Sequence, residues 1–164
     1  MPALKPGDIA PDFTLTALNN GVRKLFRLSE HRENSVLLLF HSLNWTPASE
    51  QFVRAVAGVC EAIAAAGAEL IAISVDSVFN TMAWEKAVGP LEFFLGSDYW
   101  PHGAVAEQYG VFRPAGDPAG VSAQAAFIID RQGKIVFARE YSEGQPPDTQ
   151  ELLAALRQAN SSAA

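Results

Sequence analysis

Continuous apolar blocks mark the interior strands of the chain. Ser35–His41 and Leu70–Val75 are strand-length, uninterrupted by charge and flanked by polar residues, a pattern typical of strands buried on both faces. The weaker strand-like segments, each bounded by turn-forming residues, are Asp12–Leu15, Val22–Phe26, Phe93–Leu95, Ala125–Ile129 and Lys134–Glu140. The turn sequences Asn19–Gly21 and Asp130–Gly133 join four of these segments into two hairpins.

Apolar residues at helical spacing follow the buried blocks. Thr46 is placed as an N-cap with Pro47 in the first turn, and Gly67 ends the helix that they begin. The other segments with helical signals are Leu28–Glu30 (a single turn), Asn80–Val88, Ala104–Tyr109 and Thr149–Gln158 (capped by Asp148 or Thr149). The order β-β-β-α-β-α-β-α-β-β-α predicts a mixed central sheet with helices on both faces, an α/β fold of thioredoxin-like topology.

Length and composition fit one globular domain over residues 1–164, with Arg113–Gly120 as a surface loop and residues 160–164 as a frayed tail. The formal net charge of -6 and the scattered basic residues argue against nucleic-acid binding. No apolar stretch is long enough to cross a membrane, and the N-terminal residues do not resemble a signal peptide, so we expect a cytoplasmic protein without membrane contact.

The inventory of reactive side chains is small. The single cysteine, Cys60, excludes an intramolecular disulfide and any cysteine-based zinc or iron–sulfur site. The three histidines, His31, His41 and His102, lie far apart in the sequence. We therefore expect neither a metal nor a cofactor.

Several short strings occur together in an order and spacing that resemble one known family. They are Gly7–Leu15, Ser74–Ser77, Ala83–Trp84, Ser97–Gly103, Tyr109–Phe112 and Phe127–Ile135. The chain is similar over about Lys5–Leu156 to the alkyl hydroperoxide reductase and thiol-specific antioxidant family, the peroxiredoxins. It resembles most the one-cysteine bacterial alkyl hydroperoxide reductase E type. The resemblance implies a thioredoxin-like fold, thiol peroxidase chemistry and a homodimer formed edge-to-edge on the active-loop side.

The residues that the resemblance places in the active site depart from the family pattern. The family's loop reads Pro-x-x-x-Thr/Ser-x-x-Cys, and here Thr46 matches, whereas Ser42 stands at the proline and Ser49 at the cysteine. Gln124 stands at the family's arginine, and Phe52 at a glutamate that usually follows the cysteine. A serine hydroxyl cannot form a sulfenic acid, and glutamine supplies no charge to activate a nucleophile. No catalytic residue is therefore assigned among the family-equivalent positions Ser42, Thr46, Ser49 and Gln124.

These departures favour a natural, degenerate site over an isolated engineered Cys→Ser change, because four positions differ together. We interpret Thr46 and Ser49 as helix-capping residues, and Cys60 as a buried core thiol. A serine-hydrolase role for Ser49 would need a base such as His41 and an orienting acid, and no Gly-x-Ser-x-Gly elbow is present. His102 is interpreted as a structural or interface residue. The aromatic residues Trp45, Trp84, Tyr99 and Trp100 fit core packing or a dimer interface at least as well as ligand stacking.

The leading hypothesis is a non-enzymatic binding or interaction module that keeps the family scaffold. Helix N-terminal amides, the hydroxyls of Thr46 and Ser49 and the amide of Gln124 would converge on a site for a small polar or anionic ligand. The alternative is a thiol-dependent peroxidase, either in the form of a Ser49 variant of an active enzyme or acting weakly through Cys60.

Overall fold

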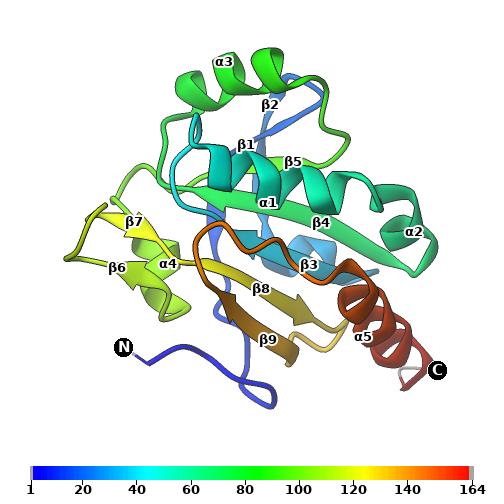
Figure 1. The fold of residues 1–164 in the computed structure, drawn as a ribbon. Coiled ribbons are helices and arrows are strands. Elements are labelled where there is room, and N and C mark those ends of the chain that lie inside the picture. Colours follow the sequence, from blue (N-terminus) through cyan, green and yellow to red (C-terminus); the bar gives the residue numbers. More distant parts are fainter. Residues whose placement is uncertain (1, 163–164) are drawn as a thin grey trace.

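A seven-stranded mixed sheet forms the centre of the molecule in the computed structural model, which describes residues 2–162 (Figure 1). Its strand order is β2-β1-β5-β4-β3-β8-β9. These strands are β1 (Thr14–Asn19), β2 (Val22–Arg27), β3 (Ser35–Phe40), β4 (Ala68–Ser74), β5 (Phe94–Ser97), β8 (Gln124–Ile129) and β9 (Ile135–Tyr141). The arrangement confirms the expected α/β class, since strands of both directions lie between helices.

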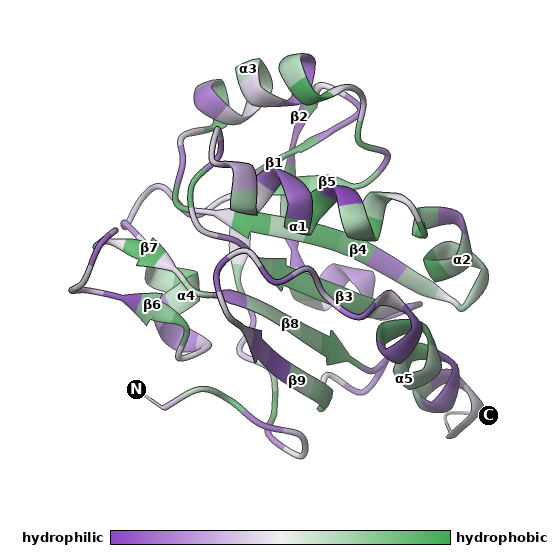
Figure 2. Cartoon of the chain, viewed as in Figure 1, coloured by the Kyte–Doolittle hydropathy of each residue, from purple (hydrophilic) through white to green (hydrophobic). Residues whose placement is uncertain are grey.

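Helices cover both faces of the sheet. They are η1 (Leu28–His31), α1 (Pro47–Ala57), α2 (Cys60–Ala65), α3 (Val78–Val88), α4 (Ala104–Gln108) and α5 (Thr149–Ser162). Residues of α1, α2, α3 and α5 pack on one face, whereas η1 and α4 contribute to the core on the other. Figure 2 shows the consequence: the central strands are hydrophobic, and the hydrophilic residues lie mainly on helices, turns and edge strands.

The central strand β3 is buried along its whole length, as its apolar run predicts. It pairs in parallel with β4, with Phe40 opposite Ile73, and antiparallel with β8, with Phe40 opposite Ala125. A strand with neighbours on both edges and cores on both faces has no polar environment to accommodate, which explains its continuous hydrophobicity. Its carboxyl end therefore lies at the middle of the sheet.

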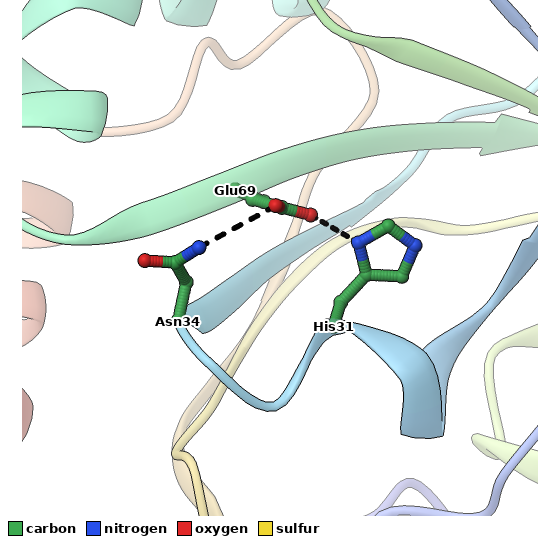
Figure 3. A network of polar contacts seen from close by, with 3 residues as sticks. All are labelled: His31, Asn34 and Glu69. Carbon is green, nitrogen blue, oxygen red and sulfur yellow. Dashed lines mark hydrogen bonds and ion pairs between the residues drawn. The ribbon is translucent and has the colours of Figure 1, made fainter.

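A polar contact anchors the start of β3 from outside the sheet (Figure 3). The Nδ1 atom of His31 pairs with Glu69 of β4, and the amide of Asn34 donates to the other oxygen of Glu69 at 3.4 Å. The His31 ring also stacks on Phe26 with a centroid distance of 4.2 Å. These contacts tie η1 and the turn after it to β4, so β3 begins in a defined position.

The prediction of one continuous helix from Pro47 to Gly67 is wrong, because the structure has two helices there, α1 and α2. At Gly58 the backbone is still helical, but Val59 adopts φ -120° and ψ 18° and α2 starts afresh at Cys60. Glycine followed by a β-branched residue is a weak helical pair, which accounts for a break at this point. Gly67, with φ +79°, ends the second helix as expected.

Three other expectations need correction. Helix α3 begins at Val78 because Ser77 caps it, two residues before the predicted start. The expected loop Arg113–Gly120 lies between two short strands, β6 (Phe112–Arg113) and β7 (Val121–Ser122), that form a separate hairpin. Helix α5 continues to Ser162, and Asn160 accepts a hydrogen bond from the Ser35 hydroxyl at 2.7 Å, so no frayed tail begins at residue 160. Residues 163–164 of the expected tail lie outside the described residues.

We predict that Phe127→Ala lowers the free energy of unfolding by about 3–5 kcal/mol. Phe127 is 2% exposed on β8, and its ring meets those of Tyr109 and Phe40 at centroid distances of 5.3 and 6.0 Å. Urea-induced unfolding followed by circular dichroism measures the loss. The control is Leu25→Ala on β2, where the side chain is exposed and we expect a change within about 0.5 kcal/mol. Equal effects of the two substitutions would contradict this placement of the core.

Candidate functional site

The candidate site lies where the chain leaves β3 at the middle of the sheet and enters α1. The segment 41–46 makes this connection, and its residues His41, Ser42 and Asn44 are all buried. Gln124, at the start of the neighbouring strand β8, reaches the same place because its Nε2 donates to the carbonyl of Ala48 at 3.2 Å. The structure thus brings the amide of Gln124 to the residue next to Ser49.

Thr46 caps α1 as predicted. Its hydroxyl accepts from the backbone N–H of Ser49 at 3.2 Å and donates to the Leu43 carbonyl at 2.9 Å. Its own carbonyl accepts from the backbone N–H of Glu50 at 3.1 Å, and Pro47 at the first position has no N–H. The first turn of α1 therefore has few donors left for an anion.

The capping role expected for Ser49 is wrong, because Ser49 supplies the N–H that is capped and not the capping oxygen. Its side chain is 0% exposed, and its hydroxyl has no hydrogen-bond partner among the described residues. No general base therefore stands within hydrogen-bond reach of this hydroxyl. That geometry lacks the nucleophile–base pair that activates a catalytic serine.

Two further site atoms share this condition. The hydroxyl of Ser42 and the Oε1 atom of Gln124 are buried and have no hydrogen-bond partner in the described part of the chain. Gln124 is 2% exposed. A buried polar atom without a hydrogen bond costs about 1–3 kcal/mol. Native proteins leave few such atoms, because water or another partner usually completes their hydrogen bonding.

The sheet beneath α1 carries a second group of buried polar side chains. Gln124 lies opposite Tyr141 of β9, and continuing the β3–β8 register by one residue places His41 opposite Gln124. The His41 ring stacks on Trp84 of α3 at a centroid distance of 5.6 Å. The Nδ1 of His41, Nε1 of Trp84 and hydroxyl of Tyr141 are all buried without partners among residues 2–162. Polar groups thus cross three strands below Ser49.

This layer carries no charge at neutral pH. Burial lowers the pKa of His41 to about 4, so the imidazole is neutral. Burial, followed by the nearby charge of Glu151, raises the pKa of Tyr141 to about 12, so the phenol keeps its proton. Gln124 is uncharged at every pH. The floor of the site offers donors and acceptors without a cation that would stabilise an anion.

A buried asparagine, which sequence reasoning missed, fixes the loop. The backbone N–H of Asn44 donates to Asp76 at 2.9 Å, and its side-chain amide donates to Thr81 at 3.0 Å and to Asn80 at 3.2 Å. The hydroxyl of Ser74 also donates to Asp76 at 2.9 Å. The sequence signal that could have indicated this contact is Asp76, whose carboxylate comes shortly after the buried strand β4 and can accept hydrogen bonds from a neighbouring loop.

The loop also holds Trp45 in an unusual backbone conformation. Its φ is +67°, in the left-handed region that residues with a side chain rarely adopt, and its indole N–H donates to Asn80 at 3.2 Å. The same asparagine therefore binds the side chains of both Asn44 and Trp45. The ring of Trp45 is exposed, so the loop presents it outward.

Cys60 packs against the core but is less buried than expected for a core thiol. It starts α2, is half-buried, and its Sγ lies 3.7 Å from the carbonyl of Glu92. Burial, followed by the charges of Glu92 and Glu61, raises the pKa of the thiol. Helix α1 separates Cys60 from Ser49, a length of roughly 16 Å at 1.5 Å per residue. The thiol is therefore neither activated nor part of the candidate site.

The other residues singled out in the sequence are either packed in the interior or exposed at the surface. Phe52 is buried against the Tyr141 ring at 5.6 Å, and Trp84 lies in the core. His102 donates from Nε2 to the carbonyl of Gly120 at 2.6 Å, which is consistent with a structural role. The exposed members are Trp45, Tyr99 and Trp100. Within residues 2–162, no three His, Cys, Asp or Glu side chains gather as metal ligands, and no helix is long and apolar enough to cross a membrane.

We predict that His41→Phe flattens the pH dependence of stability between about pH 4 and 6.5. The unfolded chain protonates His41 near pH 6.5, whereas the folded protein keeps it neutral down to about pH 4, so wild-type stability falls as the pH drops through this window. The substitution should remove a slope of about 1.4 kcal/mol per pH unit from urea-unfolding measurements.

Asp98 supplies the internal control for this measurement. Burial raises its pKa to about 6, so it contributes the opposite slope, a stability that falls as the pH rises from about 4 to 6. That contribution is present in both proteins and cancels in their difference. Parallel stability curves for wild type and variant would contradict a buried, neutral His41.

Comparisons with known proteins place this geometry in a family. Alkyl hydroperoxide reductase E of Mycobacterium bovis is 34% identical over 157 residues, which cover 93% of this chain and 98% of that protein. Peroxiredoxin-2 of Mus musculus is 33% identical over 133 residues, or 77% of this chain, and the chain spans 65% of the length of that relative.

Solved structures share the fold. Mycobacterium tuberculosis AhpC matches with a TM-score of 0.85 at 23% identity, covering 98% of this chain and 96% of that one. Reduced 2-Cys peroxiredoxin of Plasmodium vivax matches with a TM-score of 0.84 at 24% identity, covering 93% and 80%. These likenesses confirm the thioredoxin-like fold. The sequence profile of the AhpC/TSA family matches residues 6–138, and with the relatives above it shows that the chain belongs to this peroxiredoxin family.

Proposed function

We propose that this chain is a peroxiredoxin-family protein that acts in the cytoplasm as a binding or interaction module and does not reduce peroxides. One observation carries the proposal: the position that matches the family's reactive cysteine holds Ser49, whose hydroxyl is buried and has no base beside it among the described residues. An oxygen nucleophile cannot pass through a sulfenic acid, so thiol-dependent turnover has no intermediate here.

The surroundings of Ser49 support the same conclusion. A peroxidatic thiol needs a nearby cation or free helix amides to lower its pKa. Here Gln124 and neutral His41 supply no charge, and Thr46 occupies the Ser49 N–H. Phe52 is integrated into the core through Tyr141. The site is therefore built consistently around uncharged groups, which favours a natural rearrangement over a single Cys→Ser change.

A small neutral polar molecule suits the site better than an anion. The unpartnered hydroxyls of Ser42 and Ser49 can donate or accept, and the free Oε1 of Gln124 accepts. All three residues are buried, so a molecule larger than water or peroxide would require the loop to move. We propose that the site holds such a molecule as a structural or regulatory ligand.

A thiol peroxidase that works through Cys60 is the second candidate. It accounts for the one cysteine of the chain, which is partly accessible. Against it stands the raised pKa of the thiol, caused by burial and by two glutamates, since the thiolate is the form that attacks a peroxide.

Consumption of hydrogen peroxide with dithiothreitol as the thiol donor separates the two candidates. We expect wild-type protein and Cys60→Ala to show no turnover above the buffer rate. Wild-type turnover that Cys60→Ala abolishes would contradict the leading proposal. The double variant Ser49→Cys/Gln124→Arg should regain measurable turnover, because it restores both nucleophile and cation. Continued inactivity of a folded double variant would show that further parts of the site are missing.

We also propose a homodimer formed on the active-loop side. Exposed aromatic rings gather there: Trp45 bonds Asn80, which is next to exposed Phe79, and Tyr99 lines the same 450 Å³ groove as Leu43 and Asn80. Aromatic side chains that are exposed close together are typical of interface cores.

We expect Tyr99→Asp to convert the dimer to monomer, as measured by light scattering during size-exclusion chromatography over a range of concentrations. The matched control is Ile9→Asp. Ile9 is 66% exposed, comparable with 55% for Tyr99, but bridges Lys134 next to β9 at the far edge of the sheet. A monomeric wild type, or equal dissociation by both substitutions, would count against this surface.

A further inference from the structure

Helix α3 buries a carboxyl group that the candidate site does not use. Its inner face carries Thr81, Trp84 and Glu85, all buried. Thr81 accepts from Asn44 and Trp84 stacks on His41, so two of the three have clear structural partners. Glu85 is 7% exposed, and no hydrogen bond or ion pair joins its carboxyl group to another residue in the described range 2–162.

Glu85 lines a cavity of about 330 Å³ between the end of α3 and the β1–β2 turn. The full lining is Asn20, Gly21, Met82, Glu85, Lys86, Gly89 and Pro90. The space is open above both glycines, since no heavy atom lies within 4 Å of where a Cβ would stand on Gly21 or Gly89. The volume falls within the range of small-molecule sites. An unpaired carboxyl group therefore meets an unfilled cavity.

The electrostatics of the cavity favour a cation. The carboxyl group of Glu85 lines the cavity without a hydrogen-bond partner among the described residues, so a positive charge or a donor placed there can pair with it. Glu85 also lies in the last turn of α3, where its carbonyl accepts from Gly89, and the carboxyl end of a helix carries partial negative charge. Lys86 also lines the cavity, but its side chain is exposed, so solvent screens its charge.

The composition of the walls indicates what kind of cation fits. Within the described residues no three potential metal-binding side chains gather, and hard divalent cations need more oxygen ligands than the single carboxylate of Glu85. Met82 and Pro90 supply apolar surface instead, and Asn20 supplies an amide. An ammonium group on a short apolar body would pair with Glu85 while its body covers this surface.

We propose that this cavity is a binding site for a small organic cation, a free primary amine on a short apolar body, with Glu85 as its counter-ion. The proposal does not depend on the function suggested for the Ser49 site, because it uses different residues. It assigns the unpaired carboxyl group a role in recognition.

Benzylamine is a suitable probe, with benzyl alcohol and benzoate as neutral and anionic probes of the same shape. We expect benzylamine to shift the backbone NMR signals of Asn20, Gly21, Glu85 and Gly89 in ¹H–¹⁵N spectra, and the two matched probes to bind at least tenfold more weakly. Glu85→Gln should weaken benzylamine binding at least tenfold. The control Glu61→Gln, at an exposed position on α2, should leave the binding unchanged.

Two results would overturn the proposal. One is the absence of benzylamine shifts at these signals, or equal binding by wild type and Glu85→Gln. The other is tighter binding of N-acetyl-lysine methylamide than of benzylamine, which would assign the cation to a basic side chain of a partner protein. Glu85→Asp keeps the charge and shortens the reach, so it should bind benzylamine with an affinity between those of wild type and Glu85→Gln. Circular dichroism spectra that match the wild type establish that each variant is folded.

Discussion

The chain between β3 and α1 must leave a fully buried strand and begin a helix within one short loop, and every polar group that the loop carries inward needs a partner. Asn44 meets most of that requirement, since it bonds Asp76 after β4 and Asn80 and Thr81 of α3. The backbone N–H of Asn44 thus ties the loop to the residue after β4, and its side chain ties the loop to α3. The position of Thr46, and with it the start of α1, follows from this arrangement.

The contrast with the layer just below α1 is informative. Asn44 and its partners are satisfied, whereas His41, Ser49 and Gln124 each leave a buried atom without a hydrogen bond in the described structure. Asn44 and Thr81 are buried to about the same degree as His41, Ser49 and Gln124, so burial alone does not explain the difference. Buried polar groups without protein partners destabilise the fold, which is why the proposed ligand is assigned to this inner layer.

Local signals were enough to predict most of the fold. The buried run of β3, the N-cap at Thr46 and the turn at Asp130–Gly133 depend on neighbours in sequence, and the structure confirms each. The β6–β7 hairpin and the last turn of α5 were missed because they depend on distant partners. Asn160, for instance, is held by Ser35, 125 residues away. A propensity pattern contains no information on such a contact.

The site was predictable to a similar extent. The family pattern grouped Ser49, Thr46 and Gln124, and the structure places the amide of Gln124 at the carbonyl of Ala48, the residue before Ser49. The pattern could not reveal which hydroxyl caps the helix, since Thr46 and Ser49 are both good capping residues. Nor could it mark Glu85, which is one carboxylate among eighteen acidic residues until the fold buries it.

Helix α3 connects the site around Ser49 with the cavity lined by Glu85. Thr81 and Trp84 hold the loop and the neutral histidine, and Glu85, on the same face, lines the cavity at the β1–β2 turn. A shift of α3 away from the sheet would have to break the Asn44–Thr81 hydrogen bond and unstack His41 from Trp84. Since packed interiors do not deform continuously, the cavity and the loop are constrained to keep one common arrangement as long as α3 stays in place.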